Sequence, residues 1–422
     1  MSATYKRTTI GCFVGIFTQA VITNLTAILF VPMMDLYGFR YEHLGILVAV
    51  NFISQVMADI SFSRVIDKVG YRKVVLPTCI AAALGLVLFA VSPYIFPGNV
   101  FVGIVIATFI FAFSSGLLEI MLSPIVAAIP GNDKGPAMSL MHSFYAWGQV
   151  ATIIITTLLV FFVDDHYWPL IVLMWTVVPV AAFLIFVRAP MPDIVPAEHR
   201  QGMRALMVKP VYIVALFAIF FGAGAEVSMN QWSSTFMEKG LELPKLAGDL
   251  IGMCGYAVML GLGRTLYGIF GSKIDITKVL IGGSLLSVVC YLVVSLSPIT
   301  SVAMVACILC GIGTSLLWPG TIVIASDTFP MAGAWMFAIL AAAGDIGAGF
   351  APWITGKAAD GLAGSGLVEK FAQWLNVSPE QGSLRFGVLL ATVFSVLALV
   401  SHILLRYFRN REKTAQKSLI GG

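Results

Sequence analysis

Three carboxylates stand alone in long apolar stretches of the chain. Glu119, Glu226 and Asp345 each lie in a run of some twenty-five apolar, small or uncharged polar residues that contains no other charge. A charged side chain at hydrocarbon depth is costly and usually marks the path of an ion, a proton or a substrate. We therefore predict that these acids take up and release protons inside a membrane. His142 is a fourth candidate, because an unperturbed imidazole titrates near neutral pH.

The composition is that of a membrane protein. Hydrophobic residues make up 59% of the chain and charged residues 11%, against about 25% charged residues in an average soluble domain. A membrane-spanning helix needs roughly 20 mostly apolar residues. Twelve such stretches are predicted, at residues 9–34, 43–63, 74–95, 99–129, 136–163, 167–188, 211–237, 247–271, 278–298, 301–326, 332–356 and 386–408. The expected fold is all-α, with twelve transmembrane helices.

The basic residues predict the orientation of these helices. If the N-terminus is cytoplasmic, most of the 25 lysines and arginines fall in connections on the inner side, as the positive-inside rule requires. We therefore expect both termini in the cytoplasm and the protein in the cell (inner) membrane. The net charge of +4 reflects this bias, so nucleic acid is not an expected partner.

The longest polar connection divides the chain into two halves. Residues 191–210 are rich in proline and charge, a composition that cannot stay in lipid. The predicted domains are an N-terminal six-helix half at 1–190, this cytoplasmic linker, and a C-terminal six-helix half at 211–422 with a short basic cytoplasmic tail. The motifs that follow the second and eighth spans show weak similarity in parallel register, and two facing halves are typical of a transporter that rocks about a central site.

Several uncharged polar and aromatic side chains inside the spans could bind a solute. Residues three and four apart share one face of a helix, and polar stripes of this kind should face a water-filled cavity or another helix. Packing between helices remains the alternative for each of them. The candidate substrate-binding residues are Gln19, Asn24, Asn51, Gln55, Tyr145, Gln149, Asn230, Trp232 and Trp318.

Other charged residues near the spans are more typical of gating or packing. Arg264 and Asp327 are candidates for a structural ion pair, and Asp345 could be half of a buried pair. Asp59 occupies the position of Arg264 in the internal repeat. The spacing of the cysteines gives no zinc motif, and no phosphate-binding loop or catalytic triad is present. We expect no metal, no cofactor and no enzymatic activity.

The segment from Ser63 to Lys73 resembles the GxxxDRxGRRK signature of the major facilitator superfamily, with Ser63 in place of the first glycine. Together with the predicted six-plus-six layout, the resemblance covers the whole chain. It implies a major facilitator fold with two pseudo-symmetric halves, and a cytoplasmic gate that involves Asp67, Gly70 and Arg72. In such a turn a glycine permits a tight backbone path.

A second motif resembles a narrower branch of that superfamily. The stretch from Leu118 to Val126 is similar to the LExxxNP(Y/F) pattern in the fourth span of fucose and hexose proton symporters, with Ser123 in place of asparagine. These symporters also carry an aspartate in the first span, whereas the corresponding stretch here, 27–32, contains no acid. The resemblance implies that Glu119 couples transport to protons.

These observations predict a secondary active transporter. It would move a small polar solute, a sugar or related metabolite, by alternating access, coupled to protons, as a monomer in the lipid bilayer. A proton-driven exporter of amphipathic compounds or drugs is the first alternative, and polar amides with tryptophans favour sugars over it. A non-transporting membrane sensor is the second alternative.

Overall fold

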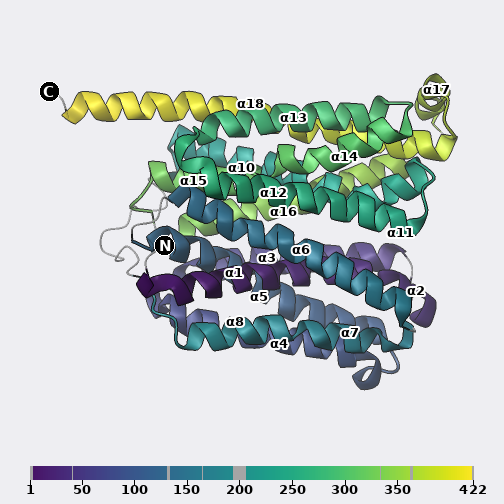
Figure 1. Ribbon diagram of the computed structural model, residues 1–422, viewed down its shortest axis with the longest axis horizontal. Helices are drawn as coiled ribbons and strands as arrows, with labels where there is room; N and C mark the ends of the chain where they lie inside the picture. The colour runs from purple at the N-terminus through teal and green to yellow at the C-terminus, as the bar shows by residue number, and fades with distance from the viewer. Residues whose placement is uncertain are drawn as a thin grey trace. The chain divides into compact units, whose positions relative to one another are not determined.

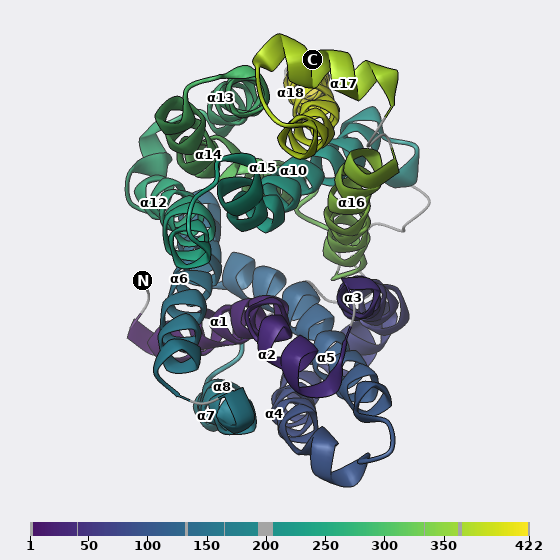
Figure 2. The same cartoon turned by 90° about the vertical axis from the view of Figure 1, so that its right-hand side faces the viewer.

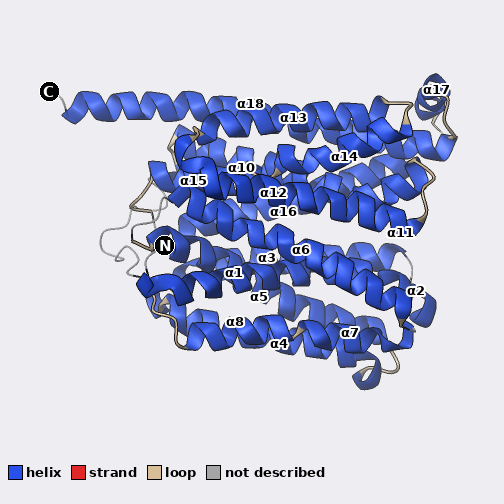
Figure 3. Cartoon of the chain, viewed as in Figure 1, coloured by secondary structure: helices blue, strands red, loops and turns tan. Residues whose placement is uncertain are grey.

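The computed structural model describes residues 3–39, 41–130, 134–163, 165–192, 206–332, 334–361 and 365–420. Within these ranges the chain consists of helices and their connections and contains no strand (Figures 1 and 3). Eleven helical segments are long and apolar enough to cross a membrane, and a shorter apolar helix, Ile46–Phe62, stands at the second expected position. The prediction of an all-α fold with twelve spans is confirmed.

The helices follow the expected spans closely. Their bounds are α1 Lys6–Ile28, α2 Phe30–Tyr37, α3 Tyr41–Val69, α4 Tyr71–Ile95, α5 Val100–Ala128, α6 Lys134–Phe162, α7 Trp168–Trp175, α8 Val177–Val187, α10 Pro210–Thr235, α11 Lys245–Ala247, α12 Cys254–Phe270, α13 Ile276–Leu296, α14 Thr300–Thr314, α15 Leu317–Thr328, α16 Ala334–Gly361, α17 Gly366–Leu375 and α18 Pro379–Ile420. Short π-helical turns precede α11 and α12.

The chain separates into two compact units. Unit 1 comprises residues 1–200 and 333–342, and unit 2 comprises residues 201–332 and 343–422. We describe each unit by itself. The domain limits expected from the sequence stay a prediction.

Three of the expected spans are interrupted, each near a proline. The first span is divided at Leu29, the sixth at Thr176 and the tenth at Ser315 and Leu316. Proline has no backbone N–H, so the carbonyl four residues before it loses its helical hydrogen bond. Pro32, Pro179 and Pro319 lie a few residues beyond these points. In lipid the carbonyl freed in this way must find another donor.

Aromatic side chains form the centre of one hydrophobic cluster in unit 1. Trp168 is 1% exposed, and its ring meets Phe89 edge-on with centroids 5.6 Å apart. Its indole nitrogen donates to the Tyr37 hydroxyl oxygen at 3.2 Å. Because buried tryptophans need a partner for their N–H, this bond fixes α7 against the end of α2.

In unit 2, α13 and α14 approach through small residues. A Cβ on Gly283 would lie 2.5 Å from the carbonyl oxygen of Gly313, whereas one on the preceding residue, Gly282, would meet open space. His402 on α18 hydrogen-bonds to the hydroxyls of Ser284 and Thr321. These contacts bring α13, α15 and α18 together around the end of α14.

Two ion pairs attach the C-terminal part of α18 to the rest of unit 2. Arg409 lies 3.6 Å from Asp327, at the end of α15, and Glu412 lies 3.6 Å from Lys209, just before α10. Asp275 caps α13 by accepting hydrogen bonds from the Thr277 backbone and hydroxyl. Partial burial would raise the pKa of Asp275, but these bonds and the nearby arginines of α18 lower it.

The two adjacent glycines of α13 give a matched test of this packing. We expect Gly283→Ala to cost about 1–3 kcal/mol, because its methyl group must displace the α14 backbone. Gly282→Ala should be neutral, or should stabilise α13 by up to about 1 kcal/mol, because alanine is the better helix former. Thermal unfolding of the purified protein in detergent measures both, and equal midpoints for the two variants would contradict the close approach of α13 and α14.

Candidate functional site

In unit 1 the isolated carboxylate of the fourth span meets an amide from the first. The Gln19 side-chain nitrogen donates to Glu119 Oε2 at 2.6 Å and to the Ser115 carbonyl oxygen at 3.2 Å. Gln19 is 2% exposed, and Glu119 is half-buried. A short donor–acceptor distance is typical of a bond to a charged carboxylate. The structure thus joins a predicted proton-coupling residue to a predicted substrate-binding residue.

A second amide pair lies on α3, close to the same stretch of α5. Gln55 donates to Asn51 Oδ1 at 2.7 Å, and both side chains are buried. The expected sharing of one helix face by these residues is therefore observed. A Cβ on Gly116 would lie 2.8 Å from the Gln55 backbone. This absence of a side chain lets α3 approach α5 three residues before Glu119.

The fifth span contributes a further polar contact to α5. His142 Nε2 lies 3.4 Å from the Ser123 hydroxyl oxygen, and both side chains are buried. Ser123 follows Glu119 by four residues on the same face of α5. A serine thus stands in the position of the asparagine of the resembled motif and meets an imidazole there. Gln149 is buried and Tyr145 is half-buried on the same helix, α6.

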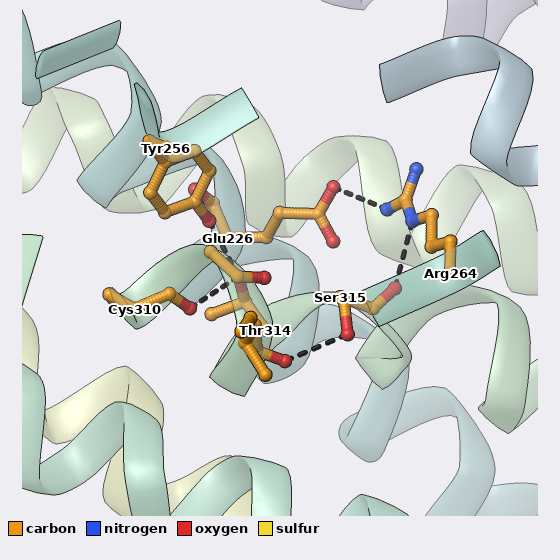
Figure 4. Close-up of polar contacts among 8 residues, drawn as sticks. Glu226, Tyr256, Arg264, Cys310, Thr314 and Ser315 are labelled. Carbon is orange, nitrogen blue, oxygen red and sulfur yellow. Dashed lines mark hydrogen bonds and ion pairs between the residues drawn. The ribbon is translucent and has the colours of Figure 1, made fainter. Parts of the chain in front are cut away.

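In unit 2 the carboxylate of the seventh span is held by an arginine. Arg264 Nη2 on α12 lies 2.6 Å from Glu226 Oε1 on α10, and the two side chains are 3% and 10% exposed (Figure 4). This pairing is not among the contacts expected from the sequence. The Arg264 guanidinium lies between α10 and the end of α14, and its expected gating role stays a prediction. Asp327 lies 3.6 Å from Arg409. A buried ion pair of Arg264 with Asp345 or with Asp327 stays a prediction.

The same arginine satisfies the backbone at the break in the tenth span. Arg264 Nε donates to the Ser315 carbonyl oxygen at 2.8 Å, and residue 319, four positions on, is a proline without an N–H. The guanidinium therefore replaces the missing helical donor. Gly263 permits the approach, since a Cβ there would lie 2.3 Å from the Ser315 hydroxyl oxygen. Ser315 is not among the residues expected from the sequence, although Pro319 is a signal that the carbonyl four residues before it lacks a helical donor.

Two tyrosines attach neighbouring helices to the backbone around Glu226. The Tyr256 hydroxyl on α12 donates to the Glu226 carbonyl oxygen at 2.9 Å, and it lies 2.6 Å from the Thr314 hydroxyl oxygen (Figure 4). The Tyr291 hydroxyl on α13 donates to the Ala225 carbonyl oxygen at 2.7 Å. Neither tyrosine had been singled out, because no periodic pattern marks a single buried hydroxyl. Together they fix α10 at the level of its carboxylate.

The predicted tryptophans of unit 2 both contact α16. Trp232 Nε1 donates to the Pro352 carbonyl oxygen at 3.2 Å. The Trp318 ring packs against Gly344, since a Cβ there would lie 2.4 Å from the ring. The buried indole N–H of Trp318 has no hydrogen-bond partner among the described residues. Gly344 precedes Asp345, which is buried. Asn230 is half-buried on α10.

The remaining expected residues lie apart from these contacts. Asn24 donates to the Ala20 carbonyl oxygen within α1, and Asp59 is fully buried on α3. Gly70 adopts a φ of 94° between α3 and α4, which confirms the tight turn. Arg72 donates to the carbonyl oxygens of residues 187 and 189, at the end of α8. The side chain of Asp67 lies outside the described part of the structure.

The double role of Arg264 can be tested with Pro319. Arg264→Met leaves Glu226 without its counter-charge and the Ser315 carbonyl without its donor, and breaking a buried ion pair costs about 3–5 kcal/mol. Pro319→Ala restores an N–H to the helix. We therefore expect Arg264→Met to lower the unfolding midpoint less in the Pro319→Ala background than in the native one, a coupling that a double-mutant cycle measures. Strictly additive effects would refute the shared role of the guanidinium at Ser315.

Comparison with known proteins places this geometry in a wider context. No curated protein sequence matches the chain. Among solved structures it is similar to the E. coli fucose:proton symporter FucP, with 15% identity and a TM-score of 0.73 over 96% of this chain and 99% of that one. It is also similar to the proton:xylose symporter XylE bound to 6-bromo-6-deoxy-D-glucose, with 15% identity and a TM-score of 0.77 over 94% and 95% of the chains.

A third similar structure is a bacterial homologue of the human lysosomal transporter Spinster, in an inward-facing and occupied conformation. Its identity is 14% and its TM-score 0.68, over 98% of this chain and 99% of that one. At these identities the likeness shows the fold alone. The family model of the Major Facilitator Superfamily matches residues 12–352, most of the chain. The chain therefore belongs to the major facilitator superfamily.

Proposed function

We propose that the chain carries a small polar solute across the membrane together with protons, and that the solute is a sugar or a related metabolite. The observation that carries this proposal is the contact between Gln19 and Glu119, 2.6 Å apart, inside the spans of unit 1. A carboxyl group in the membrane can couple transport to protons only if its surroundings accept both of its protonation states.

The amide of Gln19 suits both states of Glu119. When Glu119 is charged, the Gln19 N–H group donates to it. When Glu119 is protonated, its new O–H group needs an acceptor, since an unsatisfied donor in a buried place is costly. Gln19 Oε1 is buried and has no hydrogen-bond partner among the described residues. One side chain therefore offers a donor to the carboxylate and an acceptor to the acid.

Glu226 is less suited to this task. Its charge is balanced by Arg264 at 2.6 Å, and an opposite charge at this distance favours the ionised form of a carboxyl group. We therefore assign coupling to Glu119 and a structural role to Glu226. Ser123 lies one helical turn beyond Glu119 on α5 and contacts His142 of α6, which could pass a proton to or from the acid.

The side chains around Glu119 favour an uncharged polar solute. Asn51 and Gln55 supply amide groups beside α5, and amides can both donate to and accept from the hydroxyl groups of a sugar. FucP and XylE, which have the same fold, are named as a fucose:proton symporter and a proton:xylose symporter, and this supports the proposed class.

Replacement of the coupling acid should separate binding from accumulation. In Glu119→Gln the amide keeps the shape of the side chain but cannot titrate. We expect proteoliposomes with this variant to lose uphill uptake driven by a pH gradient, while substrate exchange at equal pH is retained. Glu380→Gln, at an exposed position at the start of α18, is the matched control and should behave as the native protein. Uphill uptake by Glu119→Gln would contradict the assignment of Glu119 as the proton-coupling residue.

The solute class can be found by ligand-induced stabilisation. A ligand that binds only the folded protein stabilises it by about 2.7 kcal/mol at a hundred times its dissociation constant. We expect neutral sugars or polyols to raise the unfolding midpoint of the purified protein, and cationic amphiphiles and organic acids to leave it unchanged. A rise with cationic amphiphiles alone would favour the exporter over the symporter.

A further inference from the structure

A short helix between the last two spans has an unusual distribution of side chains. Helix α17, Gly366–Leu375, begins at Ser365, whose hydroxyl accepts from the Val368 N–H, and ends at Asn376, which has the left-handed conformation. Both ends are thus capped. Figure 2 shows α17 lying across the end of α18 rather than along it, at the end opposite the C-terminus in Figure 1.

Three stripes run along this helix, each with the spacing of i, i+4 and i+7. The first, Val368, Ala372 and Leu375, is buried. The second consists of Leu367, Phe371 and Trp374, of which Leu367 is 60% exposed and Trp374 is 69% exposed. The third consists of Glu369, Gln373 and Asn376, which are all exposed. Successive residues of a helix differ by about 100° in direction, so the three stripes point to three different sides.

Contacts with α18 fix the rotation of the helix. A Cβ on Gly382 of α18 would lie 2.4 Å from the Ala372 Cβ, so the first stripe packs directly on the backbone of the last span. The Phe371 ring meets Phe386 of α18 edge-on, with centroids 5.4 Å apart, and lies 6.1 Å from the Trp374 ring. The apolar second stripe is therefore held beside the last span and cannot turn inward.

We propose that α17 is an interfacial anchor, whose second stripe inserts into the lipid bilayer while its third stripe faces water. The helix lies beside the start of a membrane span, because α18 begins at Pro379 and its apolar stretch begins two turns later, at Phe386. A helix at this level meets protein on one side, lipid on another and water on a third. Its three stripes match these three surroundings.

The residue types fit the level of the lipid head groups. Tryptophan is enriched at membrane interfaces, where its ring enters the apolar region, and amphipathic helices with Trp, Phe and Leu on one face lie in the interface plane. Lys370 is exposed and follows Glu369 by one position, which places it between the polar and the apolar exposed stripes. From there its long side chain can reach lipid phosphates. The partner is thus the bilayer itself.

Probes on the two exposed stripes test the proposal directly. Trp374→Cys and Leu367→Cys report on the apolar stripe. Their matched controls are Gln373→Cys, one position from Trp374, and Glu369→Cys, two positions from Leu367. Each variant carries an environment-sensitive nitrobenzoxadiazole label and is reconstituted in vesicles of phosphatidylcholine and phosphatidylglycerol. The six native cysteines are buried, and native protein treated in parallel gives the background. Iodide on both sides of the membrane quenches probes in water, and lipids with a nitroxide on the upper acyl chain quench probes in the bilayer.

We expect the labels at 374 and 367 to emit at shorter wavelength, to be quenched by the nitroxide lipid and to lose iodide quenching. The labels at 373 and 369 should show the reverse. Equal iodide quenching of all four labels would place the apolar stripe in water and overturn the proposal. Protection of 374 and 367 from both quenchers would also overturn it, because protein would then cover the stripe. All four positions are exposed, so two variants on each stripe keep the test decisive if one does not fold.

Discussion

A single backbone oxygen, the carbonyl of Ser315, sets the arrangement of unit 2. Pro319 removes its helical donor, and in lipid an unsatisfied carbonyl costs several kcal/mol. Arg264 provides the replacement at 2.8 Å. A guanidinium buried in this way needs a counter-charge, and Glu226 supplies it at 2.6 Å. The carboxylate of the seventh span, the arginine of the eighth and the break in the tenth therefore follow from one another.

The packing of unit 2 preserves this chain of contacts. Gly263 and Gly311 lack the side chains that would separate α12 from α14, since a Cβ at either position would lie 2.3 Å from an oxygen atom across the interface. Tyr256 and Tyr291 then bond to consecutive carbonyls of α10. Close approach is possible in lipid through small residues and hydrogen bonds between helices. These contacts hold α10, α12 and α14 rigidly around the buried ion pair of Glu226 and Arg264.

The membrane-spanning helices were far more predictable from the sequence than the side-chain contacts between them. Twelve apolar stretches suffice to predict the spans, because hydropathy and length decide insertion. The sequence also marks Glu119 and Glu226 as unusual, since each is the only charge in its span. It does not predict that one meets Gln19 and the other Arg264, because side-chain partners depend on how helices from distant parts of the chain rotate and pack. Helix α17 was not predicted for another reason. It has ten residues, which is too short for a hydropathy pattern typical of a membrane-spanning helix.

The two carboxylates differ in the chemistry of their partners. An arginine is always charged, so its carboxylate gains most when it is charged too. A glutamine is neutral and carries both a donor and an acceptor, and it can therefore bond to a carboxylic acid and also to its conjugate base. Glu226, beside Arg264, supports a fixed frame. Under the function proposed above, Glu119, beside Gln19, gains and loses a proton while its surroundings keep their packing, which is what a carrier needs from the group that changes charge in each cycle.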